Sequence, residues 1–281
     1  YNSLKKPGQM RAQSYQTVAH GADTIQFFQL RRSVGGCEKF HGAVIAHAGT
    51  ADTRVFREVT QLGKELEKIG SRVMGSENHA KVGIIFDWEN YWALEDTSGP
   101  NRDLRYVDQI EQMYNYFYNK NIAVDMIPID ADFSKYDLVA APVLYMVKDG
   151  VAESLEAYVQ AGGTLITTYM SGIVGQSDNV HLGGYPGPLR KMAGVWVEEI
   201  DALAPEQRNK IRFADGTEEE CRLVCDLMHL EGAEEIAQYE NDFYAGMTAV
   251  AKNQFGKGTV YYVGTDLSES GLAKVLAMAA D

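Results

Sequence analysis

The stretch KVGIIF at residues 81–86 decides the fold, because it opens a series in which strands and helices alternate along the chain. Further apolar stretches typical of buried strands stand at residues 123–129 (AVDMIPI), 138–145 (LVAAPVLY) and 164–168 (TLITT). Helical patterns occupy residues 101–119 and 149–161, between members of this series. A β-α-β series of this kind predicts a mostly parallel sheet that is covered by helices.

The pattern changes beyond Pro188, where it favours short strands over β-α-β units. These strands are expected at residues 195–200 (VWVEEI), at 222–228, and in a hairpin at 248–263 with Gly256, Lys257 and Gly258 at its turn. Residues 268–280 have the pattern of a closing helix. We therefore predict one α/β domain over residues 76–281.

Residues 1–75 contain a single further unit of α/β architecture. The expected order is a helix (9–20), a strand (24–30, TIQFFQL), a long loop, and an amphipathic helix (54–69) that ends at Gly70. A lone strand cannot form a sheet or bury both of its faces, so its neighbours must be missing or supplied elsewhere. The polar residues 71–79 (SRVMGSENH) are expected to link this domain to the next.

The charge and hydropathy pattern excludes two classes of partner. The chain carries 39 acidic and 26 basic side chains, a formal net charge of -13, and no run of lysine and arginine. Such a chain offers no positive field to a phosphate backbone, so nucleic acid is excluded. No stretch approaches the roughly 18 uninterrupted apolar residues that would cross a membrane, so a membrane partner is excluded too.

The three cysteines, Cys37, Cys221 and Cys225, form neither a disulfide framework nor a metal-ligand cluster. Cys221 and Cys225 could face each other if they lay on a helix. The simpler interpretation is free thiols in a reducing compartment, which predicts the cytoplasm.

His229 stands alone among the candidate metal ligands, and residues 181–194 (HLGGYPGPLRKMAG) lack the spacing of a phosphate loop. We predict no metal site and no cofactor.

The loop after residues 24–30 carries the polar residues best placed for ligand contacts. In an α/β barrel the loops at the C-terminal ends of the strands build the active site. Glu38 and His41, three residues apart and flanked by glycines, could both turn toward one small ligand and bind its hydroxyl groups. The alternative is purely structural: Glu38 pairs with Arg31 or Arg32, and His41 is a satisfied loop histidine.

Three blocks in this region resemble the end of the catalytic barrel in family 42 β-galactosidases. They are LKKPGQMR (4–11), VAHGADTIQFFQLRRS (18–33) and GGCEKFHGAVIAH (35–47), in the family's order and at its spacing, and the match extends through FREVTQLGKEL (56–66). The resemblance implies that Phe28, Glu38 and His41 line a pocket for the galactose ring. One departure is Leu30, where many relatives have Trp, and it alters ring packing but not the polar pair.

A retaining glycosidase needs two carboxylates about 5 Å apart, one as nucleophile and one as acid/base. In the family both lie on earlier barrel strands, and the nucleophile stands shortly before the segment that resembles YNSLKKPG. The resemblance therefore implies that no catalytic residue lies in this chain. Glu38 is not a substitute, because it resembles the substrate-binding glutamate.

KVGIIFD (81–87) and WENYWALEDTSGPNR (88–102) resemble the second domain of the same family. The implied fold is a flavodoxin-like, class I glutamine amidotransferase-like three-layer domain that follows the last βα unit of a (β/α)8 barrel. The implied assembly is a homotrimer. Trp88, Tyr91 and Trp92 on one loop could form an interface, a wall of a neighbouring sugar site, or simple packing under the linker.

Two other hypotheses stay beside the galactosidase interpretation. An amidotransferase-like hydrolase needs a reactive Cys or Ser in a tight turn, and residues 164–175 have Met170-Ser171-Gly172 with no recognisable His partner. The other hypothesis is a flavodoxin-like binding or assembly module without catalysis, in which the first 70 or so residues are a helical extension.

Overall fold

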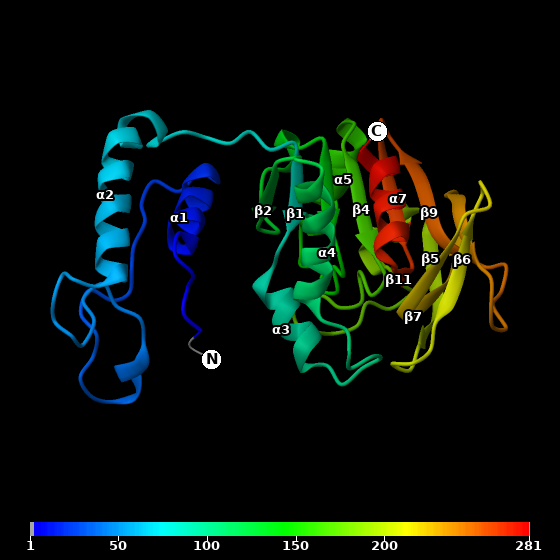
Figure 1. The fold of residues 1–281 in the computed structure, drawn as a ribbon. Coiled ribbons are helices and arrows are strands. Elements are labelled where there is room, and N and C mark those ends of the chain that lie inside the picture. The colour runs from blue at the N-terminus through cyan, green and yellow to red at the C-terminus, as the bar shows by residue number, and fades with distance from the viewer. Residues whose placement is uncertain (1–2, 281) are drawn as a thin grey trace. The chain divides into compact units, whose positions relative to one another are not determined.

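The computed structural model describes residues 3–280, and their contacts divide the chain into two compact units, Tyr1–His79 and Ala80–Asp281. Figure 1 follows the chain from blue at the N-terminus to red at the C-terminus. Each unit is described by itself.

The first unit is built from two helices and a long loop between them. Helix α1 spans Gln9–Ala19, the short 3-10 helix η1 spans Cys37–Phe40, and α2 spans Arg54–Val73. The two α-helices are joined by polar contacts, because Glu65 of α2 accepts hydrogen bonds from Arg11 Nε at 2.7 Å and from Tyr15 OH at 3.1 Å. Thr53 caps α2 by accepting a hydrogen bond from the Phe56 amide.

The prediction of a strand at residues 24–30 is wrong. In the described residues, regular pairing near it is limited to one bridge between Arg31 and Ile45. Apolar and aromatic residues favour extended backbone, but a strand is defined by a ladder of hydrogen bonds with a neighbour. The helix expected to stop at Gly70 continues to Val73, since a single glycine costs a helix only about 1 kcal/mol.

The second unit contains a parallel sheet that divides its core into two layers. The parallel strands are β1 (Val82–Ile85), β2 (Val124–Ile127), β3 (Leu138–Ala141), β4 (Thr164–Thr168) and β10 (Gly258–Val263). Their order across the sheet is β2-β1-β3-β4-β10, and every neighbouring pair is parallel. Ile84 belongs to one core cluster and Ile85 to the other, because successive side chains on a strand point to opposite faces.

Helices cover both faces of this sheet, as Figure 1 shows. Helices α3 (Trp88–Asp96), α4 (Tyr106–Asn119) and α7 (Glu269–Ala280) pack in one core cluster. Helices α5 (Val151–Ala161) and α6 (Arg190–Ala193) pack in the other, and η2 (Phe133–Lys135) and η3 (Gly187–Leu189) lie in the connections. The predicted α/β architecture of parallel strands and covering helices is therefore confirmed for this unit.

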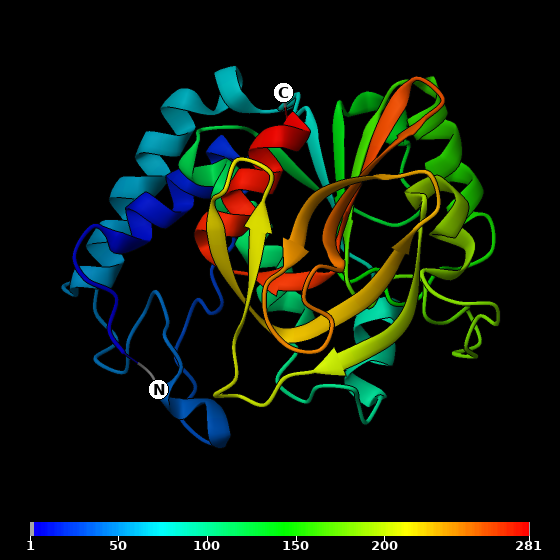
Figure 2. The same ribbon diagram turned by 90° about the vertical axis from the view of Figure 1, so that its right-hand side faces the viewer.

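An antiparallel half extends the sheet beyond β10. Its strands are β5 (Val195–Ala202), β6 (Asn209–Phe213), β7 (Glu218–Leu230), β8 (Glu234–Tyr239), β9 (Thr248–Phe255) and β11 (Thr265–Leu267). The predicted hairpin, β9 with β10, joins the two halves. Figure 2 shows the antiparallel strands, in yellow and orange, as a strongly curved extension. The sequence pattern missed β6, β8 and β11.

Two predicted boundaries moved for identifiable reasons. Strand β3 ends at Ala141, four residues early, because Pro142 has no amide to donate to a ladder. Helix α4 begins at Tyr106 and not at residue 101. Asn101 instead anchors a loop, since its side-chain amide donates to the carbonyls of Leu203 and Leu223 at 3.0 and 2.6 Å.

Candidate functional site

The loop that carries the predicted ligand-binding residues is closed at its base by backbone hydrogen bonds. The amides of Val44 and Ile45 donate to the carbonyls of Gln29 and Leu30, and the Arg32 amide donates back to Ile45. His47 Nε2 lies 2.8 Å from the carbonyl oxygen of Ser33, which adds a side-chain hydrogen bond. These hydrogen bonds hold the two ends of the loop at residues 33–43 together.

Phe28, Glu38 and His41 lie in and beside this loop. Phe28 is 74% exposed, so its ring is available to a ligand or to further protein. Glu38 is half-buried on η1, and the exposed His41 follows directly, with its amide donating to the Glu38 carbonyl at 2.9 Å. One 3-10 turn therefore carries both polar side chains. Among residues 3–280, Glu38 forms no ion pair with Arg31 or Arg32.

Three buried polar atoms of the first unit, two beside the base of the loop and one on α2, have no hydrogen-bond partner among the described residues. They are Gln29 Nε2, Arg32 Nε and Glu58 Oε2. A buried polar atom left unpaired costs about 1–3 kcal/mol, so native structures seldom tolerate three of them together. The sequence pattern singled out Arg32 only as a loop residue and a possible partner of Glu38, and it did not single out Gln29 or Glu58, which only their burial distinguishes.

The aromatic residues Trp88, Tyr91 and Trp92 lie on helix α3, so their predicted place on a loop is wrong. Asp87 caps this helix by accepting a hydrogen bond from the Asn90 amide at 3.0 Å, which turns the chain into helix directly after β1. The spacing of three and four then brings Trp88, Tyr91 and Trp92 to one side. The two tryptophans are 58% and 59% exposed and form a contiguous aromatic surface.

Buried polar contacts hold this aromatic surface in place. The Asn90 side chain is fully buried, donating to the Val143 carbonyl at 3.0 Å and accepting from the Met146 amide at 2.8 Å. Lys148 pairs with Asp87 at 2.8 Å and with Glu89. Burial lowers the pKa of Lys148, but the hydrogen bonds that its ammonium donates to the two carboxylates outweigh this effect, and the pKa is raised. Helix α3 is therefore fixed to the loop after β3.

The turn after β4 has the shape of a nucleophile elbow but lacks its chemistry. Met170 stands at the left-handed position with φ of 57°, and it is buried. The fully buried Ser171 Oγ accepts from the Leu144 amide at 3.0 Å and shares a hydrogen bond with Thr167 Oγ1 at 2.8 Å. The Ser171 hydroxyl is thus occupied by structural hydrogen bonds, and among residues 3–280 no histidine forms a hydrogen bond with it.

A buried carboxyl group lies between β7 and β10. Asp226 accepts a hydrogen bond from Tyr262 OH at 2.7 Å, and both side chains are almost completely buried. Burial raises the pKa of Asp226 to about 7, although the hydrogen bond from Tyr262 opposes this shift. Asp226 therefore links the stability of this unit to pH.

Within residues 3–280 no group of three or more His, Cys, Asp or Glu side chains could hold a metal ion. No helix in the same range is long and apolar enough to cross a bilayer.

Comparison with known families matches both units. Residues 1–69 match the sequence model of a β-galactosidase family, and residues 80–281 match the model described as a β-galactosidase trimerisation domain.

Individual relatives agree with these matches. The chain is 53% identical over 275 residues to β-galactosidase LacZ of Lactobacillus acidophilus, covering 98% of this chain and 41% of LacZ. The solved β-galactosidase of Bacillus circulans sp. alkalophilus has a TM-score of 0.95 and 50% identity, over 99% of this chain and 42% of its own. A family 42 β-galactosidase of G. stearothermophilus has a TM-score of 0.93 and 40% identity, over 99% and 40%. The chain spans about two fifths of the length of these proteins.

Proposed function

We propose, from the premise that this chain belongs to glycoside hydrolase family 42, that the complete protein hydrolyses terminal, non-reducing β-D-galactose residues with retention of configuration. The observation that carries this proposal is the match of residues 1–69 to the β-galactosidase family model. Those residues include the closed loop with Glu38 and His41 on one turn.

The galactose-binding role is assigned to Phe28, Glu38 and His41. A sugar ring offers hydroxyl groups around its edge and C–H groups on its faces. A glutamate carboxylate accepts hydrogen bonds from hydroxyls, an imidazole can donate or accept, and an exposed aromatic ring packs against the C–H face. The half-buried Glu38 and the exposed His41 and Phe28 supply these three kinds of contact.

The catalytic carboxylates are assigned to another part of the complete protein. In this interpretation the first unit is the last βα segment of a (β/α)8 barrel, and earlier barrel strands supply both the nucleophile and the acid/base. The unpaired atoms of Gln29, Arg32 and Glu58 support this assignment, because neighbouring barrel strands would give them partners.

The second unit is assigned as a flavodoxin-like, class I glutamine amidotransferase-like domain that mediates trimerisation. The parallel order β2-β1-β3-β4-β10 supports this, since it follows the flavodoxin-like order 2-1-3-4-5 with β10 in the last place. We assign the trimer contact to the aromatic surface of Trp88, Tyr91 and Trp92. Exposed tryptophans that are rigidly held are typical of interface anchors.

Activity of the complete protein and of the 281-residue chain on a chromogenic aryl β-galactoside tests the proposal. The complete protein should turn over the substrate, and the chain alone should not, because covalent catalysis needs the two carboxylates. Turnover by the purified chain above the buffer rate would contradict the assignment of Glu38 as a binding residue. Inactivity of the complete protein would favour the alternative, an assembly module without catalysis. We place the protein in the cytoplasm, as the free cysteines favour.

A further inference from the structure

Strand β7 carries two of the three cysteines, and the structure brings them together. We propose that Cys221 and Cys225 are a modification site at which a peroxide forms a reversible intramolecular disulfide.

The pairing of β7 with β11 supplies the geometric argument. Thr265 pairs with Cys225, Asp266 with Arg222, and Leu267 with Cys221. Thr265 and Leu267 are two residues apart, so their backbones are separated by about 7 Å and their side chains share one face of the strand. The two cysteines opposite them are therefore also about 7 Å apart between Cα atoms.

An irregularity in β7 produces this close approach. In a regular strand, residues four positions apart would be separated by about 13 Å, too far for a disulfide. Here one step along β11 corresponds to three steps along β7, from Arg222 to Cys225. Leu223 absorbs the excess chain in a left-handed conformation, with φ of 63°. The resulting separation lies near the upper end of the Cα–Cα range of protein disulfides.

The two thiols also interact directly. The hydrogen bond with Cys225 raises the pKa of Cys221, and burial raises this pKa further. The same hydrogen bond lowers the pKa of Cys225, whose sulfur also lies 3.7 Å from Thr265 Oγ1. One thiol therefore acts as donor and the other as acceptor, which is an arrangement that favours thiolate character on Cys225.

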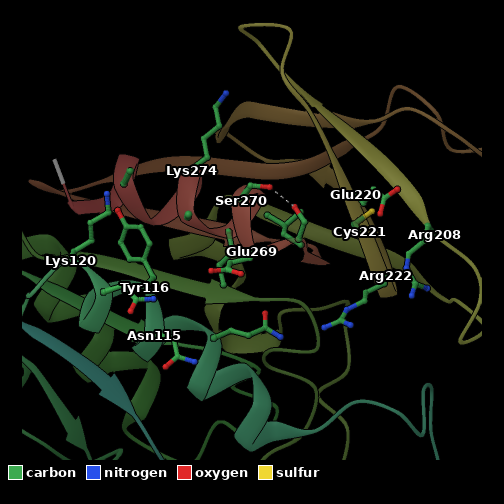
Figure 3. Close-up of a pocket in the computed structure, with 17 residues that line it drawn as sticks. Asn115, Tyr116, Lys120, Arg208, Glu220, Cys221, Arg222, Glu269, Ser270 and Lys274 are labelled. Atoms are coloured by element: carbon green, nitrogen blue, oxygen red, sulfur yellow. Dashed lines mark hydrogen bonds between the residues drawn. The ribbon is translucent and has the colours of Figure 1, made fainter.

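A groove gives a small oxidant access to one of the two cysteines, Cys221. The groove has a volume of about 970 Å³ and lies among α4, β7 and α7. Figure 3 shows Cys221 in its wall, between Glu220 and Arg222 and across from Ser270. Cys221 is only 1% exposed and Cys225 is fully buried, so bulky reagents are excluded while a neutral peroxide can enter.

The reaction balances with hydrogen peroxide as the oxidant. The Cys221 thiol passes its proton to the Cys225 sulfur that accepts its hydrogen bond, and the Cys221 sulfur attacks one peroxide oxygen. The O–O bond breaks, leaving a sulfenic acid on Cys221 and a hydroxide that is protonated from solvent to one water molecule. The Cys225 thiol, which now carries that proton, then attacks the Cys221 sulfur and forms the S–S bond. The hydroxide that leaves Cys221 takes up the Cys225 proton as a second water. Two thiols and one peroxide become one disulfide and two waters, and a thiol reductant reverses the step.

The sequence offers a direct assay, because trypsin cleaves after Arg222, between the two cysteines. Cys221 then lies on the peptide of residues 213–222 and Cys225 on that of residues 223–252. The complete folded protein is treated with hydrogen peroxide, its remaining thiols are alkylated, and it is digested without reductant for mass spectrometry. We expect the two peptides to appear as one linked species that separates on reduction. The yield should be independent of protein concentration, as an intramolecular bond requires.

Matched variants distinguish this pair from general oxidation. Cys37→Ser removes the exposed thiol and should leave the linked species unchanged. Cys221→Ala and Cys225→Ala should each abolish it. The exposed Cys37 reports when oxidation is complete. If Cys37 is then fully oxidised but Cys221 and Cys225 are both found alkylated, or carry only sulfinic acid, the proposal is overturned. The comparison of Cys37 oxidation with Cys221–Cys225 linkage is made in the unsubstituted protein. A variant that fails to fold therefore does not affect the result.

Discussion

The loop at residues 33–43 and the turn after β4 are both glycine-containing connections at possible active-site positions, yet they differ in packing. In the turn, Met170 and Ser171 are buried, and the Ser171 hydroxyl is occupied by the Leu144 amide and by Thr167 Oγ1. In and beside the loop, His41 and Phe28 are exposed, and the polar atoms Gln29 Nε2 and Arg32 Nε are unpaired directly before it among the described residues. A strained shape alone does not make a site. Available polar groups around a fixed backbone are what a ligand requires.

The largest expected change in stability comes from adding a side chain at the most tightly packed glycine of the turn. Gly172→Ala should prevent the second unit from reaching its native packing, because the added Cβ would lie 1.9 Å from the Pro186 carbonyl oxygen and φ is 65°. Urea unfolding followed by circular dichroism measures this. Gly42→Ala in the loop is the control and should change stability little, since nothing lies within 4 Å of its Cβ position. Equal effects would contradict the difference in packing.

The second prediction concerns pH. Because the pKa of Asp226 is raised to about 7, the folded unit binds this proton more tightly than the unfolded chain, whose pKa is 3.8. The contribution of this bound proton to the free energy of unfolding is complete below pH 3.8. It is lost as pH rises toward 7, by on the order of 4 kcal/mol. Asp226→Asn should therefore raise the urea midpoint at pH 8 more than at pH 5. The exposed Asp130→Asn is the matched control. A gain that does not change with pH would show that Asp226 does not titrate in this range.

The third prediction concerns assembly. Trp88→Ala combined with Trp92→Ala should dissociate the proposed trimer, because interface tryptophans often contribute about 2 kcal/mol or more each. Light scattering of the complete protein gives the mass, and circular dichroism checks that the subunit is folded. Phe243→Ala removes an aromatic side chain that is 79% exposed elsewhere in the same unit, and it should leave the trimer intact. A trimer that survives the double substitution would locate the interface elsewhere.

The smallest expected free-energy change lies in the loop. In the complete protein, Glu38→Gln and His41→Ala should each lower kcat/KM for an aryl β-galactoside about tenfold to a hundredfold, or roughly 1.5–3 kcal/mol. Part of the loss should fall on kcat, since hydroxyl contacts strengthen as the ring distorts toward the transition state. Lys39→Ala on the same turn is the control. Unchanged kcat/KM and sugar preference in both variants would make these residues structural.

The sequence predicted the parallel half of the second unit well because the strands β1, β3 and β4 are buried on both faces. Continuous apolar stretches such as residues 164–168 then mark the strands without ambiguity, and β4 spans Thr164–Thr168 as expected. It failed for β6, β8 and β11, which are half-exposed or very short. Their pairing depends on partners far away in the chain, which a local pattern does not contain.

The candidate site divides in the same way. Resemblance in the blocks at residues 18–33 and 35–47 pointed to Phe28, Glu38 and His41, and their role stays a prediction. No pattern pointed to Asn90, Lys148 or the unpaired Gln29 and Glu58, because only burial and pairing in the folded chain show their importance. The three aromatic residues at positions 88–92 were found by composition, but only the cap at Asp87 makes their segment a helix.

By itself the sequence determined the α/β class, the order of the parallel strands' segments along the chain, and the family. These follow from hydropathy periods and from blocks of side chains that are local in the chain. Only the tertiary structure decided that residues 24–30 are not a strand and that Met170 occupies the strained turn. It also decided that Cys221 and Cys225 face each other on a strand. The physical reason is that strand pairing, burial and register are properties of two segments at once, and neither segment encodes them alone.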